Sequence, residues 1–416
     1  MPDSKELTLW KDRIRQGLAA QEKYGNSKDW EQWERYYLGQ YAAPLRMNYN
    51  FALARAKVPQ VYYRNPRVIP VPRQMGRDAH ARVLENVDDW LVQEMALKQQ
   101  LKLLVLDNFI YGIGILKFGY DSEYGFKPDA ALEGELGATA LSSRNEDLER
   151  IEYNANIRAG MPWVLRVAPR EFVLDPAALE IPHAQWCAHR LMRKVGDVKE
   201  DSKYEHTSDL KSGWSEEFRS LDEARMIRAD TTMLRSQDPQ TLRPQPIQDD
   251  DWVELWEIRD TKSEQILVVA MNHDKFLRKE SDPLQIDGLP FASAAFNRNP
   301  TSFWGIPDAQ VIHPQQLELN EIRRHQQIYR RLNIRKWLMK EGALTAEEIE
   351  KFLDENASPI VSVHTSEPNP STVMQAVQTS MPPDLSAWSN EVIKDMREMI
   401  GLGRNQMGEF EGSRRT

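Results

Sequence analysis

The sequence has a single cysteine among its 416 residues and no long uninterrupted apolar run. Cys187 alone cannot form a disulfide within the chain, and one cysteine fits a reducing compartment. The most apolar stretch, residues 101–121, is broken by Asp107 and Asn108 and falls short of the roughly 20 apolar residues that cross a bilayer. The first residues alternate in charge, so we expect no secretory signal.

Nucleotide-binding motifs are missing as well. The glycines of Gly112-Ile113-Gly114 do not form a dinucleotide fingerprint, because Lys117 stands where the third glycine would fall. No glycine-rich loop followed by Lys and Ser or Thr, the pattern that cradles phosphates, is present. We therefore expect no cofactor.

Metal-binding patterns are weak. His183, Cys187 and His189 lack a second ligand pair, whereas structural metal sites use four closed ligands at recognisable spacing. Asp249-Asp250-Asp251 lies at the end of a segment rich in Pro and Gln, where an acidic run is usually just solvated. An alternative function is a metal-dependent nuclease that uses the Asp249–Asp251 cluster. We otherwise expect no metal and no catalytic residue.

What the sequence does contain predicts an α+β fold that is mainly α. Leu7, Trp10, Ile14 and Leu18 recur at helical spacing, and a second apolar stripe over residues 84–105 predicts helices that bury one side. Prolines across residues 59–72 favour extended chain there.

Later segments continue the mixed pattern. The β-rich runs 252–260 and 264–272, separated by the turn Thr261-Lys262-Ser263, predict a hairpin. A polar helical stretch is expected from Val195 to about Leu234.

The strongest feature is a basic run on an expected long helix, from about Asp308 to about Lys340. Between Arg323 and Lys340 there are seven Arg or Lys and no acidic residue, although the whole chain carries a net charge of −9. A small αβ unit follows, with an expected helix at 345–354 and expected strands at 359–366 and 371–378. A second helix is expected from Leu385 to Ile400.

The order of these parts resembles the portal proteins of tailed double-stranded DNA bacteriophages over nearly the whole chain. The resemblance is carried by 47–73, by "LDNFIYGIGILKFGYD", by "RVAPREFVLDPAA" with Asp175-Pro176, by "HAQWCAHR", and by the passage through Trp304-Gly305 and Asn320. Agreement of several local patterns in one order is more informative than any one of them.

The resemblance implies a ring of usually twelve copies at one capsid vertex, without catalysis, in a virion made in the bacterial cytoplasm. Double-stranded DNA would pass without sequence specificity, and the implied partners are the terminase large subunit, major capsid and scaffold proteins and a head-tail adaptor, with no membrane. The implied regions are a wing (1–305), two stem helices (306–338 and 384–402), a clip (339–383) and the start of a tunnel loop (403–416). Within the wing, 1–110 would be helical, 111–194 and 252–300 β-rich, and 236–251 a surface loop. The crown that normally follows would be absent or belong to a longer parent chain.

The resemblance also gives expected site residues. The basic band on the first stem helix faces either another subunit or partner, or the DNA, and the first reading is favoured because a charged helix face is usually solvated or paired. Glu321, Glu391 and Asp395 are candidate partners for it. The expected residues are Arg323, Arg324, Arg330, Arg331, Arg335 and Lys336 in the band; Ser362, Val363, His364, Met374 and Gln375 in clip docking; Lys394 and Arg397 on the second stem helix; and Arg404 and Asn405 at the tunnel-loop start.

Overall fold

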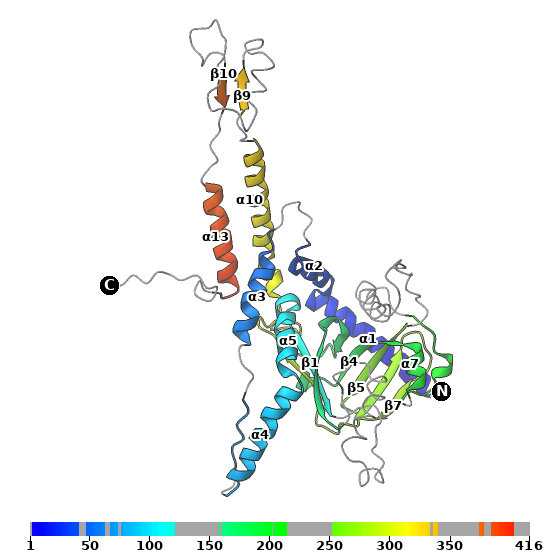
Figure 1. Cartoon of the computed structure of the whole chain (residues 1–416). Helices are drawn as coiled ribbons and strands as arrows, with labels where there is room; N and C mark the ends of the chain where they lie inside the picture. The colour runs from blue at the N-terminus through cyan, green and yellow to red at the C-terminus, as the bar shows by residue number, and fades with distance from the viewer. Residues whose placement is uncertain are drawn as a thin grey trace, which may run out of the picture. The chain divides into compact units, whose positions relative to one another are not determined.

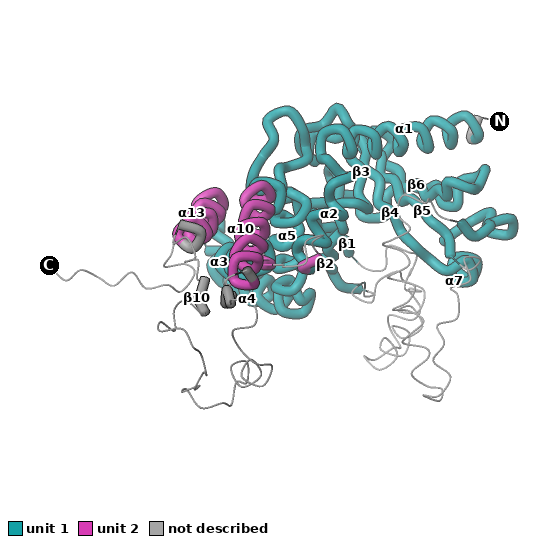
Figure 2. Tube along the Cα trace, turned by 90° about the horizontal axis from the view of Figure 1, so that it is seen from above, with its two compact units in different colours: residues 1–38, 50–311, 404–416 teal, residues 39–49, 312–403 magenta. Residues whose placement is uncertain are grey.

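The computed structural model describes residues 2–40, 47–62, 67–73, 76–120, 157, 160–201, 203–213, 252–332, 336–339, 374–377 and 384–402. These residues form two compact units. The described part of the first unit comes from 2–38 and 50–311, and that of the second from 39–49 and 312–402 (Figure 2). Helices and antiparallel sheets occupy separate stretches of the chain, which is an α+β arrangement.

The N-terminal helices of the chain precede the sheets. They are α1 (Pro2–Gly25), α2 (Ser27–Tyr37), α3 (Tyr49–Val61), α4 (Asp78–Glu94) and α5 (Leu97–Tyr111). Leu7, Trp10 and Ile14 of α1 are buried, as their spacing predicts. Helix α3 runs through Pro59 into its last turn, so the predicted extended chain begins only after Val61. Pro59 has no N–H to bond the carbonyl of residue 55 and its ring crowds that carbonyl, which fits the end of the helix two residues later.

A five-stranded antiparallel sheet with strand order β3-β4-β5-β6-β7 is the centre of the first unit. Its strands are β3 (Phe172–Leu174), β4 (Trp186–Lys194), β5 (Trp252–Asp260), β6 (Gln265–Ala270) and β7 (Arg278–Ser281). Strands β5 and β6 form the predicted hairpin, with Trp256 opposite Val269. Apolar residues of β5 are buried on both faces of the sheet, so a slip of one residue would exchange the side chains that enter the two cores.

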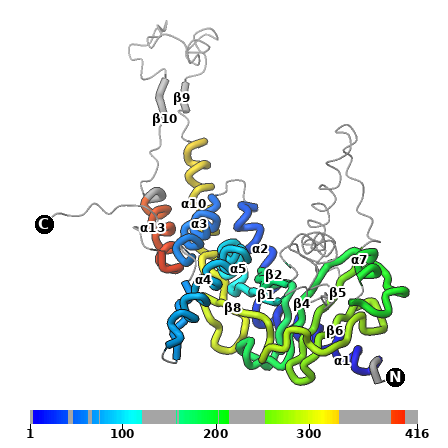
Figure 3. Tube along the Cα trace, turned by 60° about the horizontal axis from the view of Figure 1, so that its bottom comes forward, coloured from blue at the N-terminus to red at the C-terminus, as the bar shows by residue number. Residues whose placement is uncertain are grey.

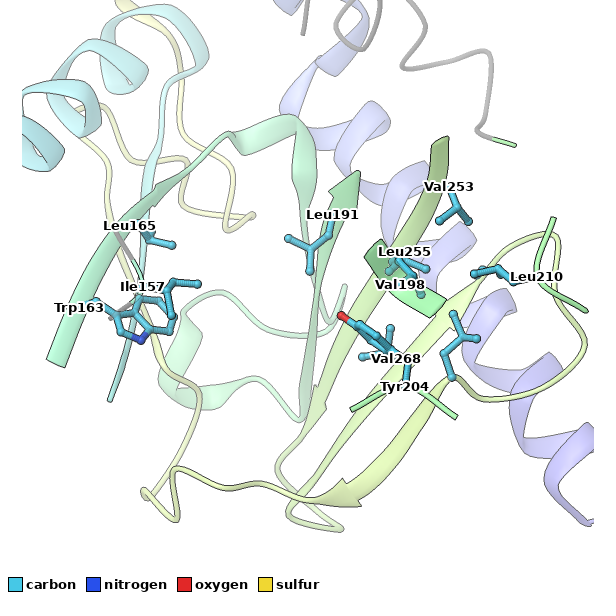
Figure 4. Packing of buried hydrophobic residues seen from close by; sticks show 12 residues of the cluster. Ile157, Trp163, Leu165, Leu191, Val198, Tyr204, Leu210, Val253, Leu255 and Val268 are labelled. Atoms are coloured by element: carbon cyan, nitrogen blue, oxygen red, sulfur yellow. The ribbon is translucent and has the colours of Figure 1, made fainter. Parts of the chain in front are cut away.

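Alternate residues of this sheet enter different cores. Trp256 and Ile258 face α1, which lies along the sheet (Figure 3), and pack with its Trp10 and Ile14. Val253 and Leu255 point to the opposite face. There they join a cluster with residues of β2 (Pro162–Val167), β4, β6, the chain after β4, and the positions just before β2 and β7. Its members are Ile157, Trp163, Leu165, Leu191, Val198, Tyr204, Leu210, Val253, Leu255, Val268, Ala270 and Leu277 (Figure 4).

A smaller antiparallel sheet has the order β2-β1-β8. Its strands are β1 (Gly114–Tyr120), β2 (Pro162–Val167) and β8 (Phe291–Ala294). Lys117 of β1 donates to both carboxylate oxygens of Glu257 on β5, at 2.8 and 3.0 Å, which joins the two sheets through a buried ion pair. Burial alone would raise the pKa of Glu257, but Lys117, Arg259 and His189 outweigh it and hold that pKa far below its usual range.

The Gly112 pattern has a structural role. Gly112 ends α5 in the left-handed conformation, with φ of +83°, and its N–H donates to the Asn108 carbonyl at 3.0 Å. A Cβ at Gly112 would lie 2.5 Å from the carbonyl oxygen of Gly305. Only glycine fits a positive φ at such a close backbone approach.

Three short 3₁₀ helices and one short α-helix connect these strands. They are η1 (Pro169–Glu171), η2 (Ile181–His183), α7 (Val195–Glu200) and η3 (Thr207–Asp209). The helical stretch predicted from Val195 to about Leu234 is therefore wrong beyond Glu200 in its described part, and residues 214–234 lie outside the described residues. Asp201 accepts from Arg193 at 2.9 Å and from the Lys203 N–H at 3.2 Å, contacts that compete with helical bonding.

The prediction that 84–105 buries one continuous side is wrong for its first half. Leu104 and Val105 of α5 are buried, but none of the residues of α4 is. Helical spacing predicts an apolar face without saying what covers it.

The predicted long helix is shorter than expected. The chain forms α9 (Asp308–Val311) and α10 (His313–Leu332) and then the strand β9 (Lys336–Met339), which pairs with β10 (Met374–Val377). Strand pairing therefore prevails over helix extension beyond Leu332, where the basic run has no acidic residue to offset its charge. The last helix of the described residues is α13 (Asp384–Met399).

Candidate functional site: the paired helices α10 and α13

Helices α10 and α13 of the second unit pack side by side (Figure 1). The apolar residues that they bury include Leu319 and Ile322 on α10 and Val392 and Met396 on α13. At the margin of the pair, the indole N–H of Trp388 on α13 donates to Glu318 Oε1 on α10 at 2.6 Å. The two helices therefore form one body held by an apolar seam and a polar contact beside it.

Two buried amide side chains fix the segment before α3 to α10. Gln316 donates from Nε2 to the Met47 carbonyl at 2.7 Å, and its Oε1 accepts from the Tyr49 N–H at 3.2 Å. Asn320 accepts from the Met47 N–H at 3.2 Å and from Gln316 Nε2 at 3.2 Å. We call Gln316 and Asn320, together with their partners Met47 and Tyr49, the amide clamp. Buried polar groups that are bonded in this way fix one arrangement of chain segments.

The sequence signal for the amide clamp is weak. Gln316 and Asn320 are four residues apart, so they share one side of α10 with the buried apolar residues. A pair of amides on an otherwise apolar helix side is the pattern that could have pointed to this contact. In the sequence, Asn320 stands out only through the family resemblance.

The basic band divides into two rows on α10. Arg323 and Arg330 are one heptad apart, as are Arg324 and Arg331, and the two rows are turned from each other by about 100°. Arg323 is half-buried and donates from Nη1 to Gln326 Oε1 at 3.0 Å, whereas the other three are exposed. The band therefore has a row beside the buried side of α10 and a row on its exposed side.

The exposed side of α10 also carries apolar residues. Leu317, Arg324, Ile328 and Arg331 follow one another at helical spacing, and Leu317 and Ile328 are 47% and 42% exposed. We call these four residues the outer face of α10. An alternation of large apolar and cationic side chains is typical of an interface more than of a purely solvated surface.

Helix α13 has a matching flank of opposite charge. Trp388 and Met399 are 54% and 50% exposed, and Glu391 and Asp395 are exposed on the same flank of the helix. We call these four residues the acidic flank of α13. Among the described residues, the outer face of α10 stays exposed, and so does most of the acidic flank, whose Trp388 also bonds Glu318.

The two predicted basic residues of α13 have different surroundings. Arg397 donates from Nε to the Tyr49 hydroxyl at 2.7 Å and lies over the Tyr49 ring at 5.8 Å, so it belongs to the internal packing of the unit. Lys394 is exposed, and its Nζ lies 3.5 Å from Glu398 Oε1. An exposed pair of this kind contributes little to stability.

Several predicted site residues cannot be placed in this geometry. Lys336, Met374 and Gln375 lie in the β9–β10 pair, where Gln375 is opposite Leu338. The remaining predicted residues lie outside the described residues: Arg335, Ser362, Val363, His364, Arg404 and Asn405.

The residues first weighed for metal binding do not converge where they are described. Cys187 and His189 are buried on β4 and His183 is exposed in η2, and burial raises the pKa of the Cys187 thiol well above its usual value. Across the described ranges, no group of three or more His, Cys, Asp or Glu could hold a metal ion. Asp249–Asp251 lies outside them.

The most perturbed carboxylates serve internal ion pairs of the first unit. Arg166 contacts Asp107 through two bonds of 2.6 Å each. Burial raises the pKa of Asp107 to about 6 despite this contact, and Glu34 adds to the rise. Perturbed groups of this kind point to chemistry when they line a cleft. Asp107 and Glu257 are instead enclosed by their partners.

Comparison with known families decides the wider identity. A family model described as Phage SU10 portal protein matches residues 91–408, which is most of the chain. The chain belongs to this phage portal protein family. The match spans α5 to α13 and so includes both sheets and the helix pair, and it confirms the resemblance predicted from the sequence.

Membership in the portal family makes the chain a component of the phage capsid. The family is structural, and its members assemble as oligomers. The family gives no support to the nuclease alternative. No match was found among curated proteins. In the part of the chain that the structure describes, none of the helices has the length and apolar character to span a membrane.

Proposed function

We propose that the chain forms a ring at one capsid vertex, through which double-stranded DNA enters during packaging and leaves during ejection. Family membership supports an oligomeric capsid role. The observation that carries the proposal is the pair α10–α13, which exposes a basic apolar face on one helix and an acidic apolar flank on the other.

A head-to-tail contact would join these two surfaces. The outer face of α10 in one copy would pack against the acidic flank of α13 in the next, with Leu317 and Ile328 meeting Trp388 and Met399. Arg324 and Arg331 would then pair with Glu391 and Asp395. A heterologous contact of this kind closes into a ring when its rotation divides a full turn. The basic band is thus mainly a subunit interface in this proposal.

The size of such a ring suits DNA. Twelve helices of about 10 Å diameter, side by side, give a circle about 38 Å across through their axes and a bore of roughly 28 Å. A duplex about 20 Å wide passes with room for water. The acidic chain, at −9 per copy, would repel phosphate, which suits a conduit that must not retain its cargo.

The remaining regions take the roles that the portal family resemblance implies. Residues 1–305 would form the wing toward the capsid shell, helices within 306–338 and 384–402 the stem, and 339–383 the clip. The clip would dock the terminase during packaging and the head-tail adaptor afterwards. Two strands alone are marginally stable, so we propose that β9 and β10 gain further pairing from neighbouring copies.

Charge reversal tests the interface role of the band. We expect Arg324→Glu with Arg331→Glu to abolish rings seen by electron microscopy, and Glu391→Arg with Asp395→Arg in the same chain to restore them. Arg15→Glu on α1, another exposed arginine, is the matched control and leaves rings intact. Normal rings in the first variant, with loss of DNA packaging in a phage assembly reaction, would instead show that the band faces DNA.

A further inference from the structure

Among the described residues of the first unit, helix α4 carries a prominent exposed apolar surface. Val83, Leu84, Val87 and Trp90 recur at helical spacing, and each is between 43% and 59% exposed. We call these four residues the α4 stripe. A clustered apolar helix face that stays exposed marks an interaction site, whereas scattered exposed apolar residues do not.

The segment before α4 is also apolar and uncovered. Residues 67–73, Arg-Val-Ile-Pro-Val-Pro-Arg, are extended, and Val68, Ile69 and Val71 are 49%, 65% and 80% exposed. We call this segment the strap. Pro70 and Pro72 each fix their own φ and favour an extended, polyproline-like backbone, so less chain entropy is lost when the strap is bound.

The strap lies on the far side of α4 from the stripe. Arg67 donates from Nη2 to Glu85 Oε1 at 2.7 Å, and the chain between α3 and α4 runs alongside α4 (Figure 1). Two residues turn a helix by about 200°, so Glu85 and Val87 point to opposite sides. One chain therefore cannot cover its own stripe with its strap while this ion pair is kept.

The charges of the two surfaces are complementary. Helix α4 contains five carboxylates and one arginine, whereas the strap has an arginine at each end and no carboxylate. Asp88 follows Leu84 by one helical turn and so borders the stripe. A basic apolar ligand is therefore the chemistry that fits the stripe, and the strap has that chemistry.

We propose that the strap of one copy packs onto the α4 stripe of the next copy, with Arg73 beside Asp88. This contact rests on the self-assembly proposed above and adds a second head-to-tail interface, on the first unit. Residues 67–90 precede the segment matched by the portal family model, 91–408, so the family match does not assign them. Each copy offers one strap and one stripe, which suits a closed ring without free ends.

Disulfide crosslinking tests the contact in the full chain. The buried Cys187 gives little background, because its thiol is inaccessible and its pKa is raised by burial. A chain carrying both Val71→Cys and Val87→Cys should give a ladder of linked copies under oxidation. Equal amounts of the two single variants should give only linked pairs. The matched control combines Val71→Cys with Arg82→Cys, an exposed position on another side of α4, and should give no ladder.

The outcomes separate this inference from the proposed function. Rings in electron micrographs without a ladder above the control would overturn the strap contact and leave the ring intact. Monomers without a ladder would overturn both.

A charge exchange gives a second measurement that does not depend on cysteine chemistry. Arg73→Glu or Asp88→Arg alone should raise the concentration at which rings form by at least tenfold, and the two together should return it toward the original value. Equal effects of single and double variants would overturn the pairing of Arg73 with Asp88.

Discussion

The β-sheets of the first unit and the helix pair of the second differ in how completely one chain covers them. Between the sheets, Lys117 and Glu257 are almost fully buried and bonded to each other. On the helix pair, Leu317, Ile328 and Trp388 stay about half exposed among the described residues, beside the exposed charged side chains of Arg324, Arg331 and Glu391. The sheets are therefore complete within one chain, whereas the helix pair retains surfaces suited to another copy.

The difference follows from how each element buries its side chains. A strand between two layers, such as β5, sends alternate residues into two cores and leaves no face for a partner. A helix in a two-helix body covers only one side, so its other side is available for binding. Mutations in the two regions should accordingly affect different measurements.

The largest effect is expected for the ion pair between the sheets. Lys117→Ala leaves Glu257 buried without its main partner and should lower the free energy of unfolding by about 3–5 kcal/mol in urea denaturation. Lys117→Met with Glu257→Met should recover most of that loss, because an apolar pair needs no charge compensation. A double variant as unstable as the single one would show that the sheets do not depend on this pairing.

A pH-dependent effect is expected for Asp107. Its folded pKa of about 6 exceeds the ordinary 3.8, so the stability it contributes is present below pH 4 and is lost as pH rises through 6. The unfolding free energy of wild type, relative to Asp107→Asn, should fall by about 2 kcal/mol from pH 4 to pH 7, which is most of the about 3 kcal/mol that the whole shift gives at 1.36 kcal/mol per pKa unit. A difference independent of pH would contradict the raised pKa.

The amide clamp should have an intermediate effect within the second unit. Gln316→Ala removes contacts to Met47, Tyr49 and Asn320 and should cost about 1–3 kcal/mol, because buried polar partners are left unsatisfied. Gln315→Ala, on the half-buried neighbouring position, is the control and should cost less. The Tyr49 amide should exchange its hydrogen faster in Gln316→Ala than in the control, which would show that the loss of stability arises at the amide clamp.

The smallest effect on stability is expected on the outer face of α10. Leu317→Ala should change the unfolding free energy of the subunit by no more than about 0.5 kcal/mol, as for other exposed positions. It should nevertheless reduce ring formation measured by mass photometry, whereas Leu9→Ala on α1, a leucine of similar exposure, should not. Equal ring formation in the two variants would contradict the interface.

Local patterns were sufficient for part of the fold. The β5–β6 hairpin follows from two β-rich runs and the short turn between them, and the buried face of α1 follows from helical spacing. The end of α10 at Leu332 does not, because strand pairing with β10, about 40 residues later, competes with helix propensity. The exposure of α4 was equally out of reach, since periodicity marks an apolar face but not its occupant.

The candidate site also has a part that could be predicted from the sequence and a part that could not. The heptad spacing of the arginines was readable from the sequence, and so was their charge. The amide clamp was missed, because it joins Gln316 and Asn320 to a segment about 270 residues earlier, and single-chain spacing carries no signal for such contacts. Identity as a portal protein came from the order of parts, which the family match then confirmed.

The proposed ring requires the outer face of α10 to be covered by the acidic flank of α13 from the next copy. A cryo-electron microscopy map of the purified chain is the most direct test of this contact. We expect closed rings with a central hole wider than a DNA duplex, in which Ile328 and Arg331 lie against Trp388 and Asp395 of the neighbouring copy. Rings in which the outer face of α10 stays open to solvent, or a chain that remains monomeric at assembly concentrations, would contradict it.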